Sequence, residues 1–308
     1  MPKTIGLIPE RRRIIAIGRV YAYVKKEIIR EMRKMSLMKY SEIAAIRTRK
    51  RIGQLLELAN KKTYQWAKDA IPAAYGEAKR NADVSLDILG LRPNPLYSVR
   101  KHTGSIDDSI KKTMDYMIKA NGSMRNITNQ YLHLMKMSAE ELIQLQEFEG
   151  WEEAAEQWIR DEILDGVESG ASRQLVAAQI RNYLMDEMDE DGLVNVKGRR
   201  YQPRYYAEMV ARTEMRKSQS QAVINSCNQY ETDLVEVSDH GTTTPVCLNY
   251  EGKVFSLSGH NPNYPYLDQE PPFHPNCQHF LYPTSPEAVE TSQYKEYQES
   301  PWFGEGGI

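Results

Sequence analysis

Four side chains that could bind a metal or act as nucleophiles occur in the last quarter of the sequence. His274, Cys277 and His279 lie in the proline-rich stretch "PPFHPNCQHFLYP", and Cys247 precedes it. Two thiolates and two imidazoles can bind Zn²⁺ tetrahedrally and hold a small fold together. The spacing is not that of a zinc knuckle, because Thr244 stands where the first Cys of a Cys-x-x-Cys pair would fall. We therefore predict no cofactor and keep zinc as an alternative.

The same turn allows two other interpretations. Cys277 with His274 or His279 could form the nucleophile of a thiol-dependent hydrolase, which requires a lowered thiol pKa and an orienting Asn or Asp. In a purely structural role, His274 binds backbone groups of the turn, Cys277 is a small buried hydrophobe, and His279 points outward from a strand. We find no further cluster of Asp, Glu and His in the sequence. We therefore predict that the protein is not an enzyme.

A second polar group lies on a helix that we expect to begin at Pro203. Arg212, Thr213 and Glu214 follow one another there. The Arg could hold an anion while the Glu acts as a base, but Arg–carboxylate pairs are also common scaffolding. We predict the structural role, in which Arg212 and Glu214 tie this helix to the proline-rich turn.

The elements that position these residues form a small α+β region. A hairpin turning at Lys197-Gly198 is expected before the helix, and three short strands are expected over 233–239, 252–257 and 278–283. Asp239 ends the first strand, and its side chain is expected to accept hydrogen bonds from backbone amides of the following turn. The chain re-enters a strand at Gly252.

The preceding sequence is helical in character. Apolar residues recur every three or four positions over 14–28, and a second helix is expected from Ser41 until Pro72 ends or kinks it. A loop over 90–105, a helix over 106–120, a capping box at 138–141, a helical stripe over 151–163 and a cap at Ser172 follow. The predicted fold class is α+β, with a largely helical N-terminal region followed by a C-terminal module of helices plus a small antiparallel sheet.

Charge divides the sequence unevenly. Residues 1–120 hold 26 basic and 12 acidic side chains, although the net charge of the whole chain is −2. The basic side chains on the expected first two helices are candidates for docking to a partner or to DNA phosphates. They are Arg11, Arg12, Arg13, Lys25, Lys26, Arg30, Arg47, Arg49, Lys50 and Arg51.

Three interpretations of this basic region remain open. The apolar stripe Ile14, Ile17, Val24 and Ile28 could lie in a groove of a protein partner, which we rank first. The basic side chains could instead bind DNA non-specifically, or the helices could form a self-contained bundle with a solvated basic face. Mean hydropathy is −0.62, no apolar run could span a bilayer, and the N-terminus does not resemble a signal peptide. We therefore expect no membrane partner and a cytoplasmic site of synthesis.

The ordered set of motifs resembles a known family. Arg212-Thr213-Glu214 is followed by Asp239, by "TTPVC" ending at Cys247, by "GKVF" from Gly252, and by "PPFHPNCQH" with Pro272, His274, Pro275 and Cys277. This order is similar to the C-terminal module of the Mu F-like minor head (minor capsid) proteins of tailed phages. Gln278 stands where the family commonly has Arg, and Thr244 replaces one Cys of a pair found in many members.

The resemblance covers about residues 150–285 and implies a structural role. It implies a low-copy head protein at the portal vertex, with portal and other head proteins as partners, located in the virion head and in the host cytoplasm during assembly. Some members are thought to act in DNA packaging or ejection. We accordingly expect a docking region over 1–150, the Mu F-like module over 151–285 and a tail over 286–308. A thiol- or zinc-dependent hydrolase and a non-specific DNA-binding protein remain the alternatives.

Overall fold

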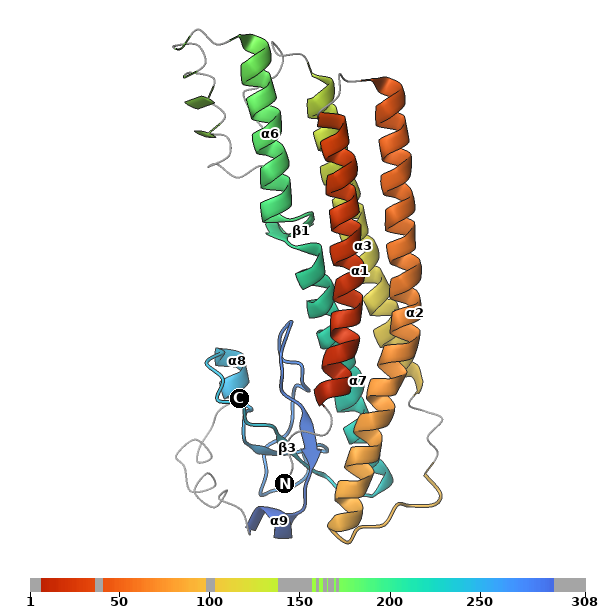
Figure 1. Ribbon diagram of the computed structural model, residues 1–308. Helices are drawn as coiled ribbons and strands as arrows, with labels where there is room; N and C mark the ends of the chain where they lie inside the picture. The colour runs from red at the N-terminus through yellow and green to blue at the C-terminus, as the bar shows by residue number, and fades with distance from the viewer. Residues whose placement is uncertain are drawn as a thin grey trace. The chain divides into compact units, whose positions relative to one another are not determined.

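The computed structural model describes residues 7–36, 41–97, 103–137 and 172–290, with six further residues between 157 and 169. The chain divides into two compact units. One unit is built from Met1–Ile14, Tyr64–Met114 and Met209–Ile308, and the other from Ile15–Thr63 and Asp115–Glu208. Four helices contribute to both units (Figure 1). They are α1 (Leu7–Ser36), α2 (Glu42–Ile88), α3 (Thr103–Lys136) and α7 (Pro203–Gln229).

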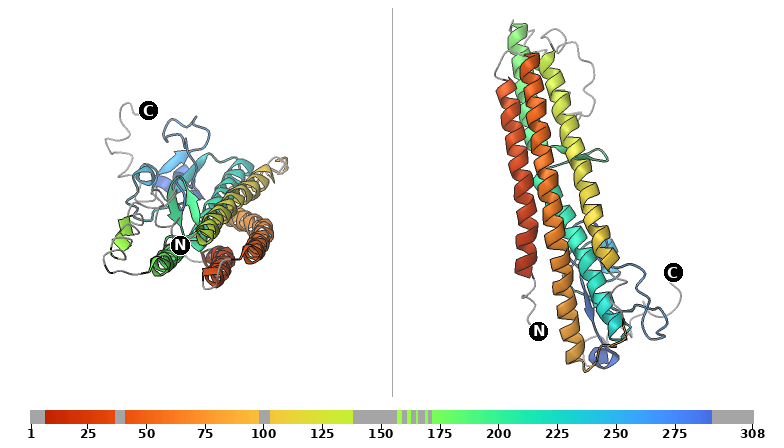
Figure 2. Two further views of the ribbon diagram at one scale, coloured as in Figure 1. Left: turned by 90° about the horizontal axis from the view of Figure 1, so that it is seen from above. Right: turned by 90° about the vertical axis from the view of Figure 1, so that its right-hand side faces the viewer.

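The second unit is a helical bundle. Segments of α1, α2 and α3 lie side by side with α6 (Arg173–Asp191), as Figures 1 and 2 show. Its core includes Tyr21, Leu56 and Met124, which come from three different helices and are at most 1% exposed. The Tyr21 hydroxyl lies 3.0 Å from Oγ1 of Thr63, so the polar end of this buried ring is satisfied.

The apolar stripe of α1 packs inside the chain. Ile17, Val24 and Ile28 are at most 2% exposed, and Ile14 is 4% exposed. Burial of such side chains removes their apolar surface from water and stabilises the helix packing. The hypothesis that this stripe lies in a groove of a partner protein is therefore wrong, because these side chains are already covered within the chain.

Local signals at the end of the bundle are confirmed. Ser172 caps α6 and its side chain accepts a hydrogen bond from the backbone N–H of Leu175. Strands β1 (Val194–Val196) and β2 (Arg199–Tyr201) pair antiparallel and turn at Lys197-Gly198. Both turn residues have positive φ, at 53° and 81°, which suits a tight hairpin.

The first unit contains a three-stranded antiparallel sheet in the order β4-β3-β5. The strands are β3 (Leu234–Val237), β4 (Val254–Ser256) and β5 (Leu281–Pro283), which confirms the three expected strands. A short helix, α8 (Pro245–Leu248), lies between β3 and β4 in the chain, and another, α9 (Pro286–Glu290), follows β5. The core of this unit joins sheet residues such as Val235 and Phe255 to Val223 and Cys227 of α7.

The α+β fold class is confirmed, whereas several helix bounds differ from those expected. Helix α2 continues through Pro72. The proline removes one backbone hydrogen bond, but burial of the neighbouring Ala70, Ile71 and Ala74 compensates for this loss. Helix α3 extends to Lys136, well beyond the expected end at 120. The expected capping box at 138–141 and most of the stripe over 151–163 lie outside the described residues.

Within the described part of the chain, no helix is both long enough and apolar enough to cross a membrane.

A buried ion pair lies in the first unit. Nη2 of Arg216 is 3.1 Å from Oε1 of Glu10, and the two side chains are only 6% and 8% exposed. Gln219 donates a further hydrogen bond of 3.2 Å to the other carboxylate oxygen, and the Arg216 guanidinium lies 5.1 Å from the centre of the Phe280 ring. Each charge is therefore compensated within the protein.

Glu10→Gln is expected to lower the free energy of unfolding by about 3 kcal/mol, because it leaves the Arg216 guanidinium buried without a counter-charge. Urea unfolding followed by circular dichroism measures the effect. The control is Asp108→Asn, which breaks the exposed pair with Lys112 and should cost at most about 1 kcal/mol. Equal losses in the two variants would show that the buried pair has no special role.

Candidate functional site

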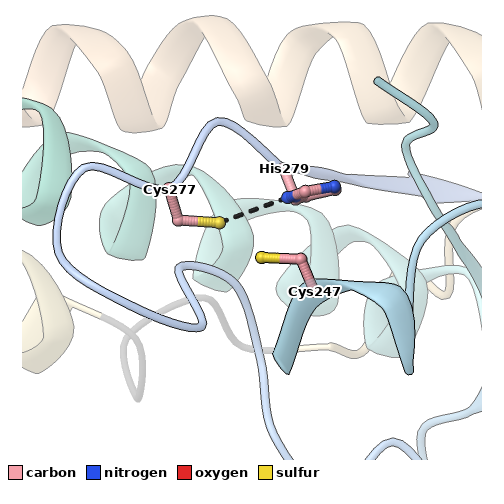
Figure 3. A group of neighbouring side chains, drawn as sticks. All are labelled: Cys247, Cys277 and His279. Atoms are coloured by element: carbon pink, nitrogen blue, oxygen red, sulfur yellow. Dashed lines mark hydrogen bonds between the residues drawn. The ribbon is translucent and has the colours of Figure 1, made fainter. Parts of the chain in front are cut away.

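The proline-rich turn and the loop after β3 bring three of the four candidate ligands together. Cys247 comes from α8, whereas Cys277 and His279 come from the segment that leads into β5. Their ligand atoms all lie within 4.8 Å of one another, and all three residues are buried. Figure 3 shows the two sulfur atoms pointing toward each other beside the imidazole ring. Sγ of Cys277 is 3.3 Å from Nδ1 of His279.

His274 does not join this group. Its Nδ1 lies 2.8 Å from the backbone oxygen of Pro275, and its side chain is half-buried. This contact matches the structural interpretation, in which His274 binds backbone groups of its own turn. The four-ligand set expected from the sequence is therefore reduced to Cys247, Cys277 and His279.

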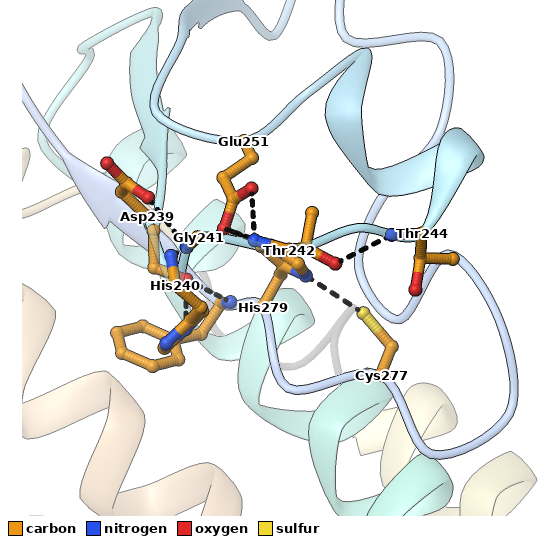
Figure 4. Close-up of polar contacts among 10 residues, drawn as sticks. Asp239, His240, Gly241, Thr242, Thr244, Glu251, Cys277 and His279 are labelled. Atoms are coloured by element: carbon orange, nitrogen blue, oxygen red, sulfur yellow. Dashed lines mark hydrogen bonds and ion pairs between the residues drawn. The ribbon is translucent and has the colours of Figure 1, made fainter.

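The second nitrogen of the buried imidazole faces a carboxylate. Nε2 of His279 is 3.2 Å from Oε1 of Glu251. The same carboxylate accepts hydrogen bonds from the backbone N–H groups of His240 and Thr242 (Figure 4). Burial acts to raise the pKa of Glu251, but these hydrogen bonds outweigh it and hold the pKa below its ordinary value.

The ionised carboxylate determines which imidazole nitrogen carries the proton. Because Glu251 can only accept hydrogen bonds, Nε2 of His279 is the donor, and Nδ1 presents its lone pair toward the thiols. The ring of His240 lies edge-on to that of His279, with centroids 5.1 Å apart. Burial and the neighbouring His279 both lower the pKa of His240. Glu251 and His240 belong to no motif in the sequence, which is why sequence reasoning did not find them.

The Cys277 thiol contacts the imidazole of His279, and this imidazole contacts the carboxylate of Glu251, as in a cysteine hydrolase. However, a substrate could not reach the thiols. Cys247 is 0% exposed and Cys277 is 1% exposed. The second thiol is not a nucleophile either, because burial and the neighbouring Cys277 raise the pKa of Cys247 to about 12, whereas a thiol nucleophile needs a lowered pKa. The arrangement therefore suits an internal role better than catalysis on a substrate.

The loop that carries Cys247 is shaped by backbone hydrogen bonds to side chains. Oδ1 of Asp239 accepts from the N–H of Gly241 at 3.0 Å, which confirms the turn expected at this Asp. Gly252 has φ of 70° and its N–H donates to the carbonyl of Val237, so the chain returns to the sheet through a conformation that favours glycine. Glu251 precedes this glycine, and its carboxylate contacts His279.

Helix α7 holds the proline-rich turn from one side. Arg212 donates to Oδ1 of Asn276, and Oγ1 of Thr213 accepts a 3.1 Å hydrogen bond from the backbone N–H of the same residue. Ser220 donates to the carbonyl of Pro271 at 2.7 Å. Asn276 has φ of 70°, and these contacts stabilise it in that left-handed conformation.

Glu214 differs from its neighbours in the motif. Its side chain is 0% exposed; Oε1 is 2.7 Å from Nζ of Lys217, while Oε2 is buried with no hydrogen-bond partner among the described residues. Burial raises the pKa of Glu214, against the opposing effect of Lys217. Among the described residues, Glu214 makes no hydrogen bond to the proline-rich turn. The expected tie between helix and turn is made by Arg212 and Thr213.

Comparison with known proteins identifies the family. A family model described as phage minor capsid protein 2 matches residues 16–301. The chain belongs to this family. The expectation of a minor head protein is thereby confirmed. The match also includes the N-terminal helices, which lie outside the motifs at 212–283. The protein is a structural component of the phage head. No curated protein and no solved structure matched the chain.

The basic residues of this minor capsid protein fall into two groups. Arg13 and Lys25 are half-buried and paired, with Glu77 at 2.6 Å and Asp189 at 2.7 Å respectively. Arg30 pairs with Glu27 on its own helix. The other candidate docking residues are exposed at the surface. They are Arg11, Arg12, Lys26, Arg47, Arg49, Lys50 and Arg51.

Arg212→Ala is expected to lower the free energy of unfolding of the minor capsid protein by about 1.5 kcal/mol, because it removes a charge-assisted hydrogen bond to the turn. Urea unfolding of the single variants Arg212→Ala and Asn276→Gly and of the double variant measures the coupling. Gly retains the positive φ and removes only the acceptor. Strictly additive effects, or an unchanged midpoint for Arg212→Ala, would contradict a tie between helix and turn.

Glu214→Gln is expected to flatten the pH dependence of stability. Because the folded pKa is raised above the ordinary 4.5, the folded protein keeps a proton that the unfolded chain loses, and stability falls over the pH range above that ordinary value, through the raised pKa. Urea midpoints measured across this range should fall less in the variant than in the wild-type protein. Glu57→Gln, on the exposed face of α2, is the control. Parallel profiles for wild type and Glu214→Gln would contradict the assignment.

Proposed function

We propose that this minor capsid protein is bound at or near the portal vertex of the phage head, where it acts in head assembly. The family match over residues 16–301 carries the proposal, because it assigns the chain to the structural proteins of the head. Portal and other head proteins are then its partners. Roles in DNA packaging or ejection would follow from a position at the vertex through which DNA passes.

The first half of α2 supplies the docking surface in this proposal. Arg47, Arg49, Lys50 and Arg51 place four cationic side chains within five residues, and all four are exposed. Ile43 and Ile46 lie one turn earlier and are 63% and 57% exposed. Large apolar side chains beside a cationic cluster suit a protein partner with an acidic rim around an apolar patch. We name the exposed residues Ile43, Ile46, Arg47, Arg49, Lys50 and Arg51 the α2 docking surface.

The cationic cluster also favours a second candidate function, non-specific DNA binding inside the head. Four exposed cations in five residues can neutralise phosphates and release counterions, and such binding weakens steeply as salt increases. The exposed isoleucines add nothing to contacts with phosphates. Protein docking therefore explains more of the α2 docking surface than DNA binding does.

Co-expression with the portal protein of the same phage, followed by size exclusion at low and high salt, is the test of function. We expect a complex that persists at high salt, because the exposed isoleucines contribute apolar burial that salt does not weaken. The triple variant Arg47→Glu/Lys50→Glu/Arg51→Glu and the double variant Ile43→Ser/Ile46→Ser should each weaken the complex at least tenfold.

The matched control reverses three exposed charges on α3 in the same unit, as Lys119→Glu/Arg125→Glu/Lys136→Glu, and should leave the complex intact. Equal loss in the control and the α2 variants would contradict the α2 docking surface. Absence of a complex at both salt concentrations would contradict the portal placement. Salt-sensitive binding to duplex DNA without portal binding would favour the second candidate function.

A further inference from the structure

We propose that Cys247, Cys277 and His279 bind one Zn²⁺ ion, which joins α8 to the segment leading into β5. The observation behind the proposal is the convergence of two sulfur atoms and one imidazole nitrogen within 4.8 Å in the buried core of the first unit. The proposal concerns the internal architecture of the protein and is independent of where the protein docks.

The spacing of the three ligand atoms fits a tetrahedral zinc ion. Zn–S bonds of about 2.3 Å and Zn–N bonds of about 2.0 Å place neighbouring ligand atoms roughly 3.5–3.8 Å apart. The observed separation between Sγ of Cys277 and Nδ1 of His279 is 3.3 Å, so this pair needs a shift of only a few tenths of an ångström. The separations that involve Cys247 are at most 4.8 Å and would contract by up to about 1 Å on binding. Among the described residues, no further His, Cys, Asp or Glu belongs to the group, so water takes the fourth position.

The carboxylate of Glu251 prepares the imidazole for a metal. Histidines that ligate zinc usually donate their other ring N–H to a carboxylate, which orients the ring and raises its basicity. Here Nε2 of His279 donates to Glu251 at 3.2 Å, and Nδ1 is left facing both thiols (Figure 3). Glu251 is already engaged with the N–H groups of His240 and Thr242 (Figure 4), so it supports the ligand and does not itself bind the ion.

The donor atoms and their surroundings select the kind of ion. Two thiolates and one imidazole favour zinc over magnesium or calcium, which prefer oxygen ligands. The apolar core around the sulfur atoms, which includes Phe255 and Phe273, keeps substrates away from the fourth position, so the ion joins two segments of the chain without acting on a substrate. Binding replaces the protons of both thiols by the metal, and the two protons pass to the solvent.

Titration of the reduced full-length protein with Co²⁺ tests the proposal. We expect one equivalent to bind with visible bands of tetrahedral Co²⁺ and a near-ultraviolet charge-transfer band from thiolate to metal. One equivalent of Zn²⁺ should abolish both signals, and Zn²⁺ should raise the melting temperature of the protein. Cys247→Ser and Cys277→Ser should each remove most of the charge-transfer intensity.

Two further variants define the site. Glu251→Gln should weaken metal binding by about 10- to 100-fold, as is typical when a ligand loses its supporting partner. Cys227→Ser should bind metal normally, because Cys227 is equally buried in the same core but lies outside the group.

The wild-type titration decides the matter even if a variant fails to fold. A folded wild-type chain with free thiols that binds no Zn²⁺, or that shows Co²⁺ bands without a thiolate charge-transfer band, overturns the proposal. Full charge-transfer intensity in both Cys247→Ser and Cys277→Ser, or its loss in Cys227→Ser, overturns it as well.

Discussion

The buried carboxylate of Glu251 is the contact on which the arrangement of the candidate site depends. It accepts hydrogen bonds from two backbone N–H groups of the loop after β3 and from the imidazole of His279. A single ionised group thereby joins a loop to a segment about thirty positions away in the chain. The carboxylate also orients the imidazole, so that Nδ1 faces the thiols.

The second attachment of the same turn comes from α7. Arg212 and Thr213 bind Asn276 from one side, while Glu251 holds His279 on the other. Arg212 and Thr213 thus act on the shape of one turn, in keeping with a structural family. Side chains that could resemble a catalytic set are instead used inside a packed core, where the sulfur atoms of Cys247 and Cys277 are inaccessible.

The helices pack with one face and expose another. In α1 the apolar stripe is buried in the chain, and some basic residues form internal ion pairs, such as Lys25 with Asp189. The first half of α2 buries Ala45, Ile52 and Leu55 while it exposes the α2 docking surface. A helix of this length can do both because its side chains repeat every 3.6 residues, so one face packs while the opposite face meets solvent.

The amino-acid sequence by itself determined the local features of this protein. The three strands, the hairpin at Lys197-Gly198, the cap at Ser172 and the turn at Asp239 all follow from nearby residues, and the ordered motifs were enough to predict a minor head protein. The hairpin, the cap and the turn depend on contacts within a few positions, and the strands are marked by their own residue types and by the turn residues between them.

Only the tertiary structure decided which distant side chains meet. It placed Cys247 beside Cys277 and excluded His274, and it supplied Glu251, which no motif marks. The tertiary structure also shows that the apolar stripe of α1 is buried within the chain and that α2 continues beyond Pro72. The physical reason is that an amphipathic stripe shows that a face will be covered but not by what, and that the partner of a buried polar group is chosen by the packing of the whole unit.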